Sequence, residues 1–211
     1  MPAVGLVEEG GSATKVSAHL DHEQVAVSDA VEDDLGSRQP LLVFVRDLTA
    51  TAKLVDGTEK DLSEFHVHLT EFPFEAPSTE NLNQPSRFAP GTTPTRGGVT
   101  YGIEASIDEA RDLGASEVTF SDPISIVVEN FLKLPVGSPV PLGYYERGKG
   151  HWQPETGGRV VQVLGVTGEE ADVDADGDGK ADDVSVLESL GFSHAELREL
   201  ARLHQRDQTL W

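Results

Sequence analysis

The sequence predicts a mainly β protein, built from one or two small β-sandwich or barrel modules and followed by an aspartate-rich loop and two short C-terminal helices. Three observations predict this fold class. The 211 residues include 21 Gly and 12 Pro, short alternating apolar runs recur between turn signals, and two stretches with helical spacing follow the aspartate-rich loop. With 37% apolar residues, the chain can supply one ordinary core in one or two domains.

The formal net charge is −21, and the chain contains no Cys. Nucleic-acid affinity is built largely from clustered Lys and Arg, so this charge argues against nucleic acid as a partner. Without Cys there are no disulfides, thiolate zinc sites or iron–sulfur clusters, which leaves a packed core or oxygen-ligated cations to stabilise the fold. The longest apolar run, Leu41–Val45, is far too short to span a bilayer.

Residues 1–39 carry eight acidic and two basic residues, no aromatic residue, and mostly small or polar spacers. Low hydrophobicity combined with net charge is typical of segments that order weakly, so we expect a largely flexible acidic segment with one short strand at 25–27. Its start lacks the basic and apolar regions of a secretory signal. The chain is therefore expected to be unexported, to be exported by another route, or to be a piece of a larger protein.

Residues 40–134 are expected to form the β-sandwich module. Asp56-Gly57 separates two alternating runs and predicts a hairpin over 49–62 with a type I′ turn, which needs positive φ at both central residues. The connection 73–98 is rich in Pro, Ser, Thr, Asn and Gly, and its length is typical of a docked functional loop. Further strands are predicted at 41–46, 64–70, 100–107, 117–120 and 124–128, with a helical turn at 108–113.

In the strand predicted at 64–70, His66 and His68 point to the same side, as alternate strand positions do. A His-X-His pair of this kind is one half of a metal site. No third ligand is evident nearby, so two polar residues on the solvent face of a strand are the favoured interpretation.

Residues 135–167 are expected to form a β-meander extension with strands at 140–145, 148–152 and 159–164. Tyr144, Tyr145 and Trp152 lie in this hairpin region and are candidate ligand-binding residues, as an aromatic platform for sugar rings. Cross-strand pairing that closes a small core is the more common use of such aromatic residues.

Residues 168–211 are expected to hold a calcium loop and a helical hairpin. The segment 172–183 reads Asp-Val-Asp-Ala-Asp-Gly-Asp-Gly-Lys-Ala-Asp-Asp, and eight acids face one base within 169–183. Calcium takes six to eight oxygen ligands, and EF-hand-type loops supply them from alternate positions with Gly at the turn. Calcium is therefore the predicted cofactor, because a solvated acidic linker would repel itself and seldom repeats Asp at alternate positions.

Two registers fit the calcium pattern. The first uses Asp172, Asp174 and Asp176 at positions 1, 3 and 5, with Gly177 at the turn, the Asp178 carbonyl at 7 and Asp183 at 12. The second uses Asp174, Asp176 and Asp178, with Gly179 at the turn, the Lys180 carbonyl at 7 and Asp182 at 9. The second is favoured because it uses Asp182, although position 12 then falls to Asp183, Ser185 or Glu188.

Two helices are predicted after this loop. Val184, Leu187 and Leu190 have helical spacing, and Gly191 stands where a helix ends. Ser193 with Glu196 forms a capping-box pattern at the start of a second helix over 194–205. The terminal Leu210-Trp211 pair is expected to be a strand.

The region 100–211 resembles a module of large bacterial Rhs or YD-repeat proteins, the teneurin-like and polymorphic-toxin family. The order and spacing of several weak motifs carry this resemblance. They are Tyr101–Glu104, Asp108–Ala110, Val118–Pro123, Val128–Leu132, Leu134–Gly137, Val140–Arg147, Gly150-x-Trp152-x-Pro154, Gly158–Val161, the aspartate loop, both helices and Leu210-Trp211. Residues 41–75 fit loosely, and 1–39 do not fit.

The resemblance implies a β-rich module upstream of the repeat shell of a secreted or surface-displayed protein, with a structural or plugging role and no catalysis. Its implied partners are the rest of such a protein or its encapsulated domain. The family often has Asp where Glu146 stands, and the 211 residues contain no repeat region. Calcium-dependent recognition of a carbohydrate or cell surface is the alternative. No Gly-x-Ser-x-Gly, His-Glu-x-x-His, Gly-x-Gly-x-x-Gly or P-loop spacing indicates an enzyme.

Overall fold

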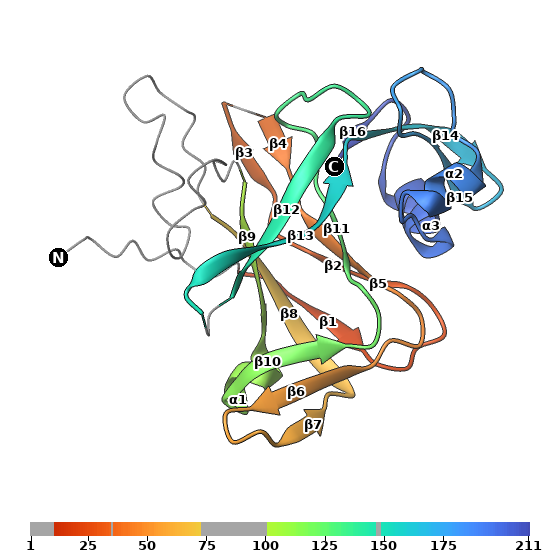
Figure 1. The fold of residues 1–211 in the computed structure, drawn as a ribbon. Helices are drawn as coiled ribbons and strands as arrows, with labels where there is room; N and C mark the ends of the chain where they lie inside the picture. Colours follow the sequence, from red (N-terminus) through yellow and green to blue (C-terminus); the bar gives the residue numbers. More distant parts are fainter. Residues whose placement is uncertain (1–10, 35, 73–100, 147–148) are drawn as a thin grey trace, which may run out of the picture.

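The structure is a computed structural model that describes residues 11–34, 36–72, 101–146 and 149–211 (Figure 1). It is mainly β, with several small sheets and three short helices, which confirms the predicted fold class. Within these ranges no sheet closes into a barrel, so the barrel alternative is wrong. The loop 73–98, predicted to be docked, lies outside the described residues.

Three three-stranded sheets surround the first hydrophobic cluster, in the orders β1-β8-β9, β10-β6-β7 and β11-β5-β2. In β8 (Glu64–Glu71), Phe65 is fully buried and the apolar residues alternate with half-exposed ones, as predicted. The other strands are β1 (Ala13–Ser17), β2 (Gln24–Val27), β5 (Leu41–Phe44), β6 (Ala50–Leu54), β7 (Glu59–Asp61), β9 (Ile103–Ile107), β10 (Ala115–Phe120) and β11 (Ser125–Val127), with α1 (Asp108–Asp112) between β9 and β10.

The predicted hairpin at 49–62 is confirmed as β6–β7, but its turn differs from the expected type. Only Gly57 has positive φ, at 86°. The Gly57 amide donates to the Leu54 carbonyl, and the Leu54 amide donates to the Thr58 carbonyl. This is a three-residue loop with glycine in the left-handed region, since Asp56 keeps negative φ and its carboxylate accepts from the Thr58 amide.

Within residues 1–39 the short strand predicted at 25–27 is confirmed as β2, but the expected flexibility is wrong for residues 13–34 and 36–38. Strand β1 pairs with β8, β2 pairs with β5, and β3 (Val31–Asp33) pairs with β4 (Gly36–Arg38). Val16 and Ala26 are fully buried in the first cluster. Low local hydrophobicity did not prevent ordering, because each strand needs only one or two apolar residues once a neighbouring sheet supplies the rest of the core. Residues 1–10 lie outside the described part.

A second hydrophobic cluster lies in the C-terminal part, where β14 (Val161–Thr167) is the middle strand between β15 (Glu170–Asp174) and β16 (Thr209–Leu210). Helices α2 (Val184–Ser189) and α3 (His194–Leu203) pack there through Leu187 and Leu197. Both predicted helices and the predicted terminal strand are thus present, and Ser193 and Glu196 form the predicted capping box. The expected boundary between 167 and 168 instead falls inside the β14–β15 hairpin.

Strands β12 (Pro139–Glu146) and β13 (His151–Arg159) form a two-stranded sheet of their own. Pro139 pairs with Arg159 at its base, next to the C-terminal part. From there the hairpin extends away from β14 and β15 (Figure 1). Both of its faces are largely exposed, including Leu142 and Tyr144.

Candidate metal centre

Three carboxylates meet in the aspartate-rich loop between β15 and α2. Asp174, Asp176 and Asp182 each offer a carboxylate oxygen, and these oxygens lie within 4.8 Å of one another. Asp174 is only 1% exposed, Asp182 is half-buried and Asp176 is exposed. Since like charges at this spacing repel, the arrangement favours a bound cation.

Backbone amides fix the orientation of these carboxylates. Asp174 Oδ1 accepts from the amides of Asp176 (3.2 Å) and Gly177 (2.6 Å), and its Oδ2 accepts from Gly179 (2.8 Å). Asp182 Oδ2 accepts from the Ala175 amide at 2.8 Å. Asp side chains that bond to nearby amides in this way stabilise tight turns, and the glycines supply the required positive φ.

The geometry favours the register that begins at Asp174, because it uses Asp174, Asp176 and Asp182 as ligands. Asp172, needed by the other register, accepts a hydrogen bond from Thr167 Oγ1 on the neighbouring strand. The remaining predicted carboxylates, Asp178 and Asp183, are likewise not members of the three-residue cluster found among the described residues.

The predicted residues outside the cluster have other roles in the structure. Asp178 accepts from the Lys180 amide at 2.8 Å, and the exposed Lys180 ammonium lies 3.4 Å from Asp178 Oδ2. Asp183 is the N-cap residue of α2, but its side chain makes no capping hydrogen bond. Asp178 therefore shapes the loop, and Asp183 begins α2 through its carbonyl, which accepts from the amides of Val186 and Leu187. Neither contributes a carboxylate to the cluster.

The donor set consists of oxygen atoms, with no nitrogen or sulfur ligand among the clustered side chains. Carboxylate and carbonyl oxygens suit hard cations such as calcium and magnesium, and do not suit the softer metals that prefer thiolate or imidazole. The residues present therefore fit an oxygen-ligated divalent cation. The cluster can hold a metal ion whose identity the side chains alone do not define.

Sequence reasoning missed the turn at 135–138 that packs on this loop. Arg159 Nη1 donates to the carbonyls of Gly137 (3.1 Å) and Ala175 (3.3 Å), which joins the turn to the residue between two clustered aspartates. A Cβ on Gly137 would lie 2.6 Å from the Asp176 carbonyl oxygen. No local sequence pattern predicts this contact. The two glycines at the contact, Gly137 and Gly177, are the only trace of it in the sequence.

The alternative His-X-His metal face does not form. His66 Nδ1 lies 2.7 Å from Glu109, and His68 Nε2 lies 3.1 Å from Asp108, so each imidazole pairs with its own carboxylate at the start of α1. These hydrogen bonds lower the pKa of Asp108, and they lower that of Glu109 in spite of partial burial, which by itself raises it. The two histidines thus fasten β8 to α1.

The structure brings together two of the three candidate aromatic residues. Tyr145 faces Trp152 across the β12–β13 hairpin, with ring centroids 5.8 Å apart. Tyr144 pairs with Gln153 and, as the neighbour of Tyr145, lies on the opposite face. A platform of all three rings is therefore excluded, and the Tyr145–Trp152 contact is a cross-strand pair of the common kind.

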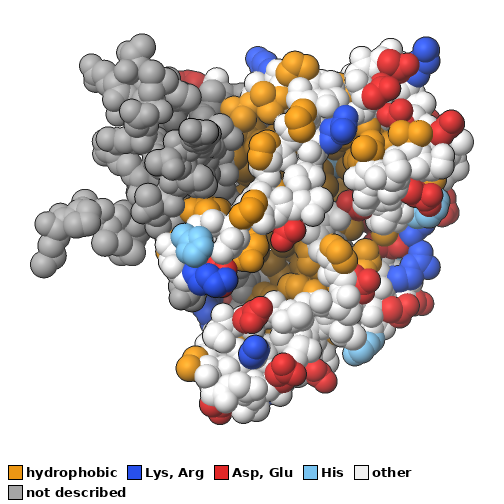
Figure 2. All heavy atoms as spheres, viewed as in Figure 1, with side chains coloured by type: hydrophobic (Ala, Val, Ile, Leu, Met, Phe, Trp, Pro, Cys, Tyr) orange, Lys and Arg blue, Asp and Glu red, His pale blue; other side chains and the backbone are white. Residues whose placement is uncertain are grey.

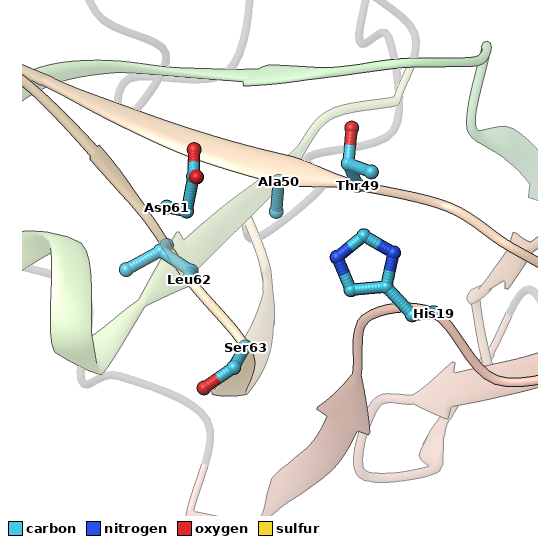
Figure 3. Close-up of a pocket in the computed structure, with 6 residues that line it drawn as sticks. All are labelled: His19, Thr49, Ala50, Asp61, Leu62 and Ser63. Carbon is cyan, nitrogen blue, oxygen red and sulfur yellow. The ribbon is translucent and has the colours of Figure 1, made fainter.

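A small hollow of about 280 Å³ lies beside β6 and β7 and is lined by His19, Thr49, Ala50, Asp61, Leu62 and Ser63 (Figure 3). It collects the residue types of a hydrolytic triad, but Figure 3 shows the Ser63 hydroxyl pointing away from the His19 imidazole. Asp61 accepts instead from Thr51 Oγ1 at 3.1 Å. These three side chains therefore do not form the hydrogen-bonded relay that such chemistry needs.

Comparisons with protein-family models, with curated proteins and with solved structures yield no match. Within the described residues, the helices are too short and too polar to cross a bilayer. On the face shown in Figure 2, acidic side chains are scattered rather than gathered into one patch. The aspartate cluster is consequently the feature with the clearest chemistry in the described part of the chain.

Proposed function

We propose that the loop 174–182 binds calcium and that the ion has a structural role, without catalysis, in joining the C-terminal helices to the β module. The single observation that carries this proposal is the convergence of Asp174, Asp176 and Asp182, with Asp174 almost fully buried. A buried carboxylate beside two others is costly unless a cation neutralises it.

The position of the loop supports the structural role. It begins at the end of β15, whose Val173 is fully buried in the second cluster, and it leads into α2, whose Leu187 is buried in the same cluster. The Asp182 amide also donates to the Val173 carbonyl at 2.8 Å. An ion held between Asp174 and Asp182 closes the loop at its two ends and so fixes the start of α2 relative to the sheet.

Thermal unfolding in calcium and in EDTA tests the proposal. A ligand that binds only the folded state adds about 2.7 kcal/mol to the free energy of unfolding at one hundred times its Kd. For a domain of this size that corresponds to a rise in Tm of roughly 5–10 °C. We expect this rise with calcium and a much smaller one with magnesium, which is more reluctant to lose its hydration shell.

Asp176→Asn is the informative variant, because an asparagine oxygen can still accept from the Asp178 amide at the same position. We expect it to lose most of the calcium-induced rise and to match or exceed the unmodified protein in EDTA, since one repelling charge is gone. Asp183→Asn is the matched control and keeps the full rise. Superimposable melts of the unmodified protein in calcium and EDTA contradict the proposal, and equal shifts with both metals contradict the assignment to calcium.

The proposed setting is a β module of a secreted or cell-surface Rhs or YD-repeat protein, in contact with the rest of that protein or its encapsulated domain. The support for this setting is the resemblance over residues 100–211, which includes the aspartate loop and the two helices after it. Co-expression with a YD-repeat shell tests it: the two chains should purify together as one complex, and separate elution would contradict the setting.

A further inference from the structure

We infer that the state of the aspartate loop is transmitted to the β12–β13 hairpin through the turn 135–138 and Arg159, so that a bound cation fixes the hairpin in place. This inference rests on the proposed function, since it assumes a cation at Asp174, Asp176 and Asp182. It concerns a regulated element outside the loop, namely the projecting hairpin that carries Leu142 and Tyr144.

The turn and the loop meet backbone to backbone at two glycines. A Cβ on Gly137 would lie 2.6 Å from the Asp176 carbonyl oxygen, and a Cβ on Gly177 would lie 2.8 Å from the Val136 carbonyl oxygen. Both glycines also have positive φ, at 83° and 87°. No other residue type fits either position without a shift of backbone. The two segments are therefore packed so closely that a displacement of one must displace the other.

Arg159 connects the same two segments from the hairpin side. It is the last residue of β13, and its Nη1 donates to the carbonyls of Gly137 and Ala175. Ala175 is fully buried between Asp174 and Asp176, and its amide donates to Asp182. The guanidinium therefore holds Ala175, which lies between Asp174 and Asp176 in the chain and is hydrogen-bonded to Asp182.

The base of the hairpin is anchored in the same place. The Gly137 amide donates to the Val160 carbonyl, and the Val160 amide donates to the Ser138 carbonyl, directly beside the Pro139–Arg159 pair. Because β12 and β13 form a sheet of their own, no ladder to another described strand fixes the hairpin's direction. The contacts at this base fix where the hairpin leaves the C-terminal part.

Without a cation, repulsion among the three carboxylates pushes the loop apart and displaces the Ala175 and Asp176 carbonyls. The contacts of Arg159 and Gly137 then loosen, and the hairpin gains freedom. With a cation, the same carbonyls return and the hairpin is held. The element with two states is the junction of turn and loop, and the cation biases it by binding only the closed arrangement.

Hydrogen exchange of the full chain, measured with and without calcium, tests the inference. Calorimetric titration measures calcium binding by the same proteins. Calcium should slow amide exchange in peptides from 139–159 by about tenfold, while peptides from the β6–β7 hairpin remain unchanged. Because the coupling is reciprocal, Arg159→Gln and Gly137→Ala should bind calcium more weakly and, once saturated with calcium, should lose this slowing. Gly158→Ala is the matched control, because Gly158 has no atom within 4 Å of an added Cβ and should respond like the unmodified protein.

Two results separate this inference from the function on which it rests. Calcium binding by the unmodified protein with no change in hairpin exchange overturns the coupling and leaves the calcium site intact. Full slowing in Arg159→Gln also overturns it, and this variant decides the matter if Gly137→Ala fails to fold. No heat of calcium binding in the unmodified protein overturns the proposed function and the coupling together.

Discussion

Arg198 on α3 forms an ion pair with Glu23, a residue 175 positions earlier in the chain at the entry to β2. The Glu23 side chain is only 11% exposed and that of Arg198 25%. The pair therefore links the helix of the second hydrophobic cluster to the N-terminal strands of the first. Burial alone would raise the pKa of Glu23, but the hydrogen bond and charge of Arg198 outweigh it and leave that pKa below its usual range.

Arg198→Leu is expected to lower the free energy of unfolding by about 1.5–3 kcal/mol, the usual contribution of a hydrogen bond to a charged group. Arg46 also reaches Glu23, at 3.3 Å, but is 55% exposed, so Arg46→Leu should cost less than about 1 kcal/mol. Urea unfolding of both variants measures the difference. Because the Glu23 pKa is depressed in the fold, the contribution is present above its unfolded pKa and is lost as the pH falls. Equal costs for the two variants would refute the argument.

Arg38→Met is expected to be more damaging, with a loss of about 3–5 kcal/mol. The Arg38 side chain is 1% exposed, donates to both oxygens of Glu71, and stacks 4.6 Å from the Phe131 ring centroid. Its removal leaves a buried carboxylate without its cation. Lys15→Met provides the comparison, because its pair with Glu64 is more than half exposed.

Urea unfolding at neutral pH measures both losses, provided that the m-values agree. The Lys15 variant should lose less than about 1 kcal/mol. A loss for Arg38→Met no larger than that of Lys15→Met would show that the buried network adds nothing to stability.

Tyr101 is expected to make the protein sensitive to alkali. Burial, and then the neighbouring Glu71 carboxylate, raise the pKa of the Tyr101 phenol well above its usual range. The folded state therefore keeps a proton that the unfolded chain loses above about pH 10, so stability is full below that pH and falls as the pH rises. In Tyr101→Phe this alkaline loss should be smaller, as measured by urea unfolding at increasing pH. An unchanged pH dependence would contradict the assignment to Tyr101.

His204 is expected to make the protein sensitive to mild acid. Burial lowers its pKa, although the charge of Glu129 and a hydrogen bond with Gln208 oppose this, and its Nε2 is buried without a hydrogen-bond partner. The unfolded chain then binds more protons, so the contribution is present above about pH 6.5 and is lost as the pH falls. NMR titration should give a pKa below that value, and His204→Gln should reduce the acid-induced loss. A pKa at or above the usual value would be contrary to the prediction.

Local patterns predicted the elements whose causes are local. The alternation around Phe65, the capping box of Ser193, and the hairpin at Asp56-Gly57 depend on neighbouring residues, and each is present. Of the N-terminal strands only the one at 25–27 was predicted. The strands β1, β3 and β4 were missed because their apolar content is low, and β1 is ordered by its pairing with β8. The turn type at Gly57 was wrong because a three-residue loop replaces the expected two-residue one.

The sequence by itself indicated an oxygen-rich loop able to hold a cation, because its aspartates recur at alternate positions with glycines between them, as in calcium-binding loops. Only the tertiary structure decided which aspartates converge. Asp174, Asp176 and Asp182 converge, whereas Asp172 lies within β15 and accepts a hydrogen bond from Thr167 on β14. It also brought Arg159 and Gly137 to the loop, because backbone contacts between distant turns depend on how whole sheets pack and leave no periodic trace in the chain.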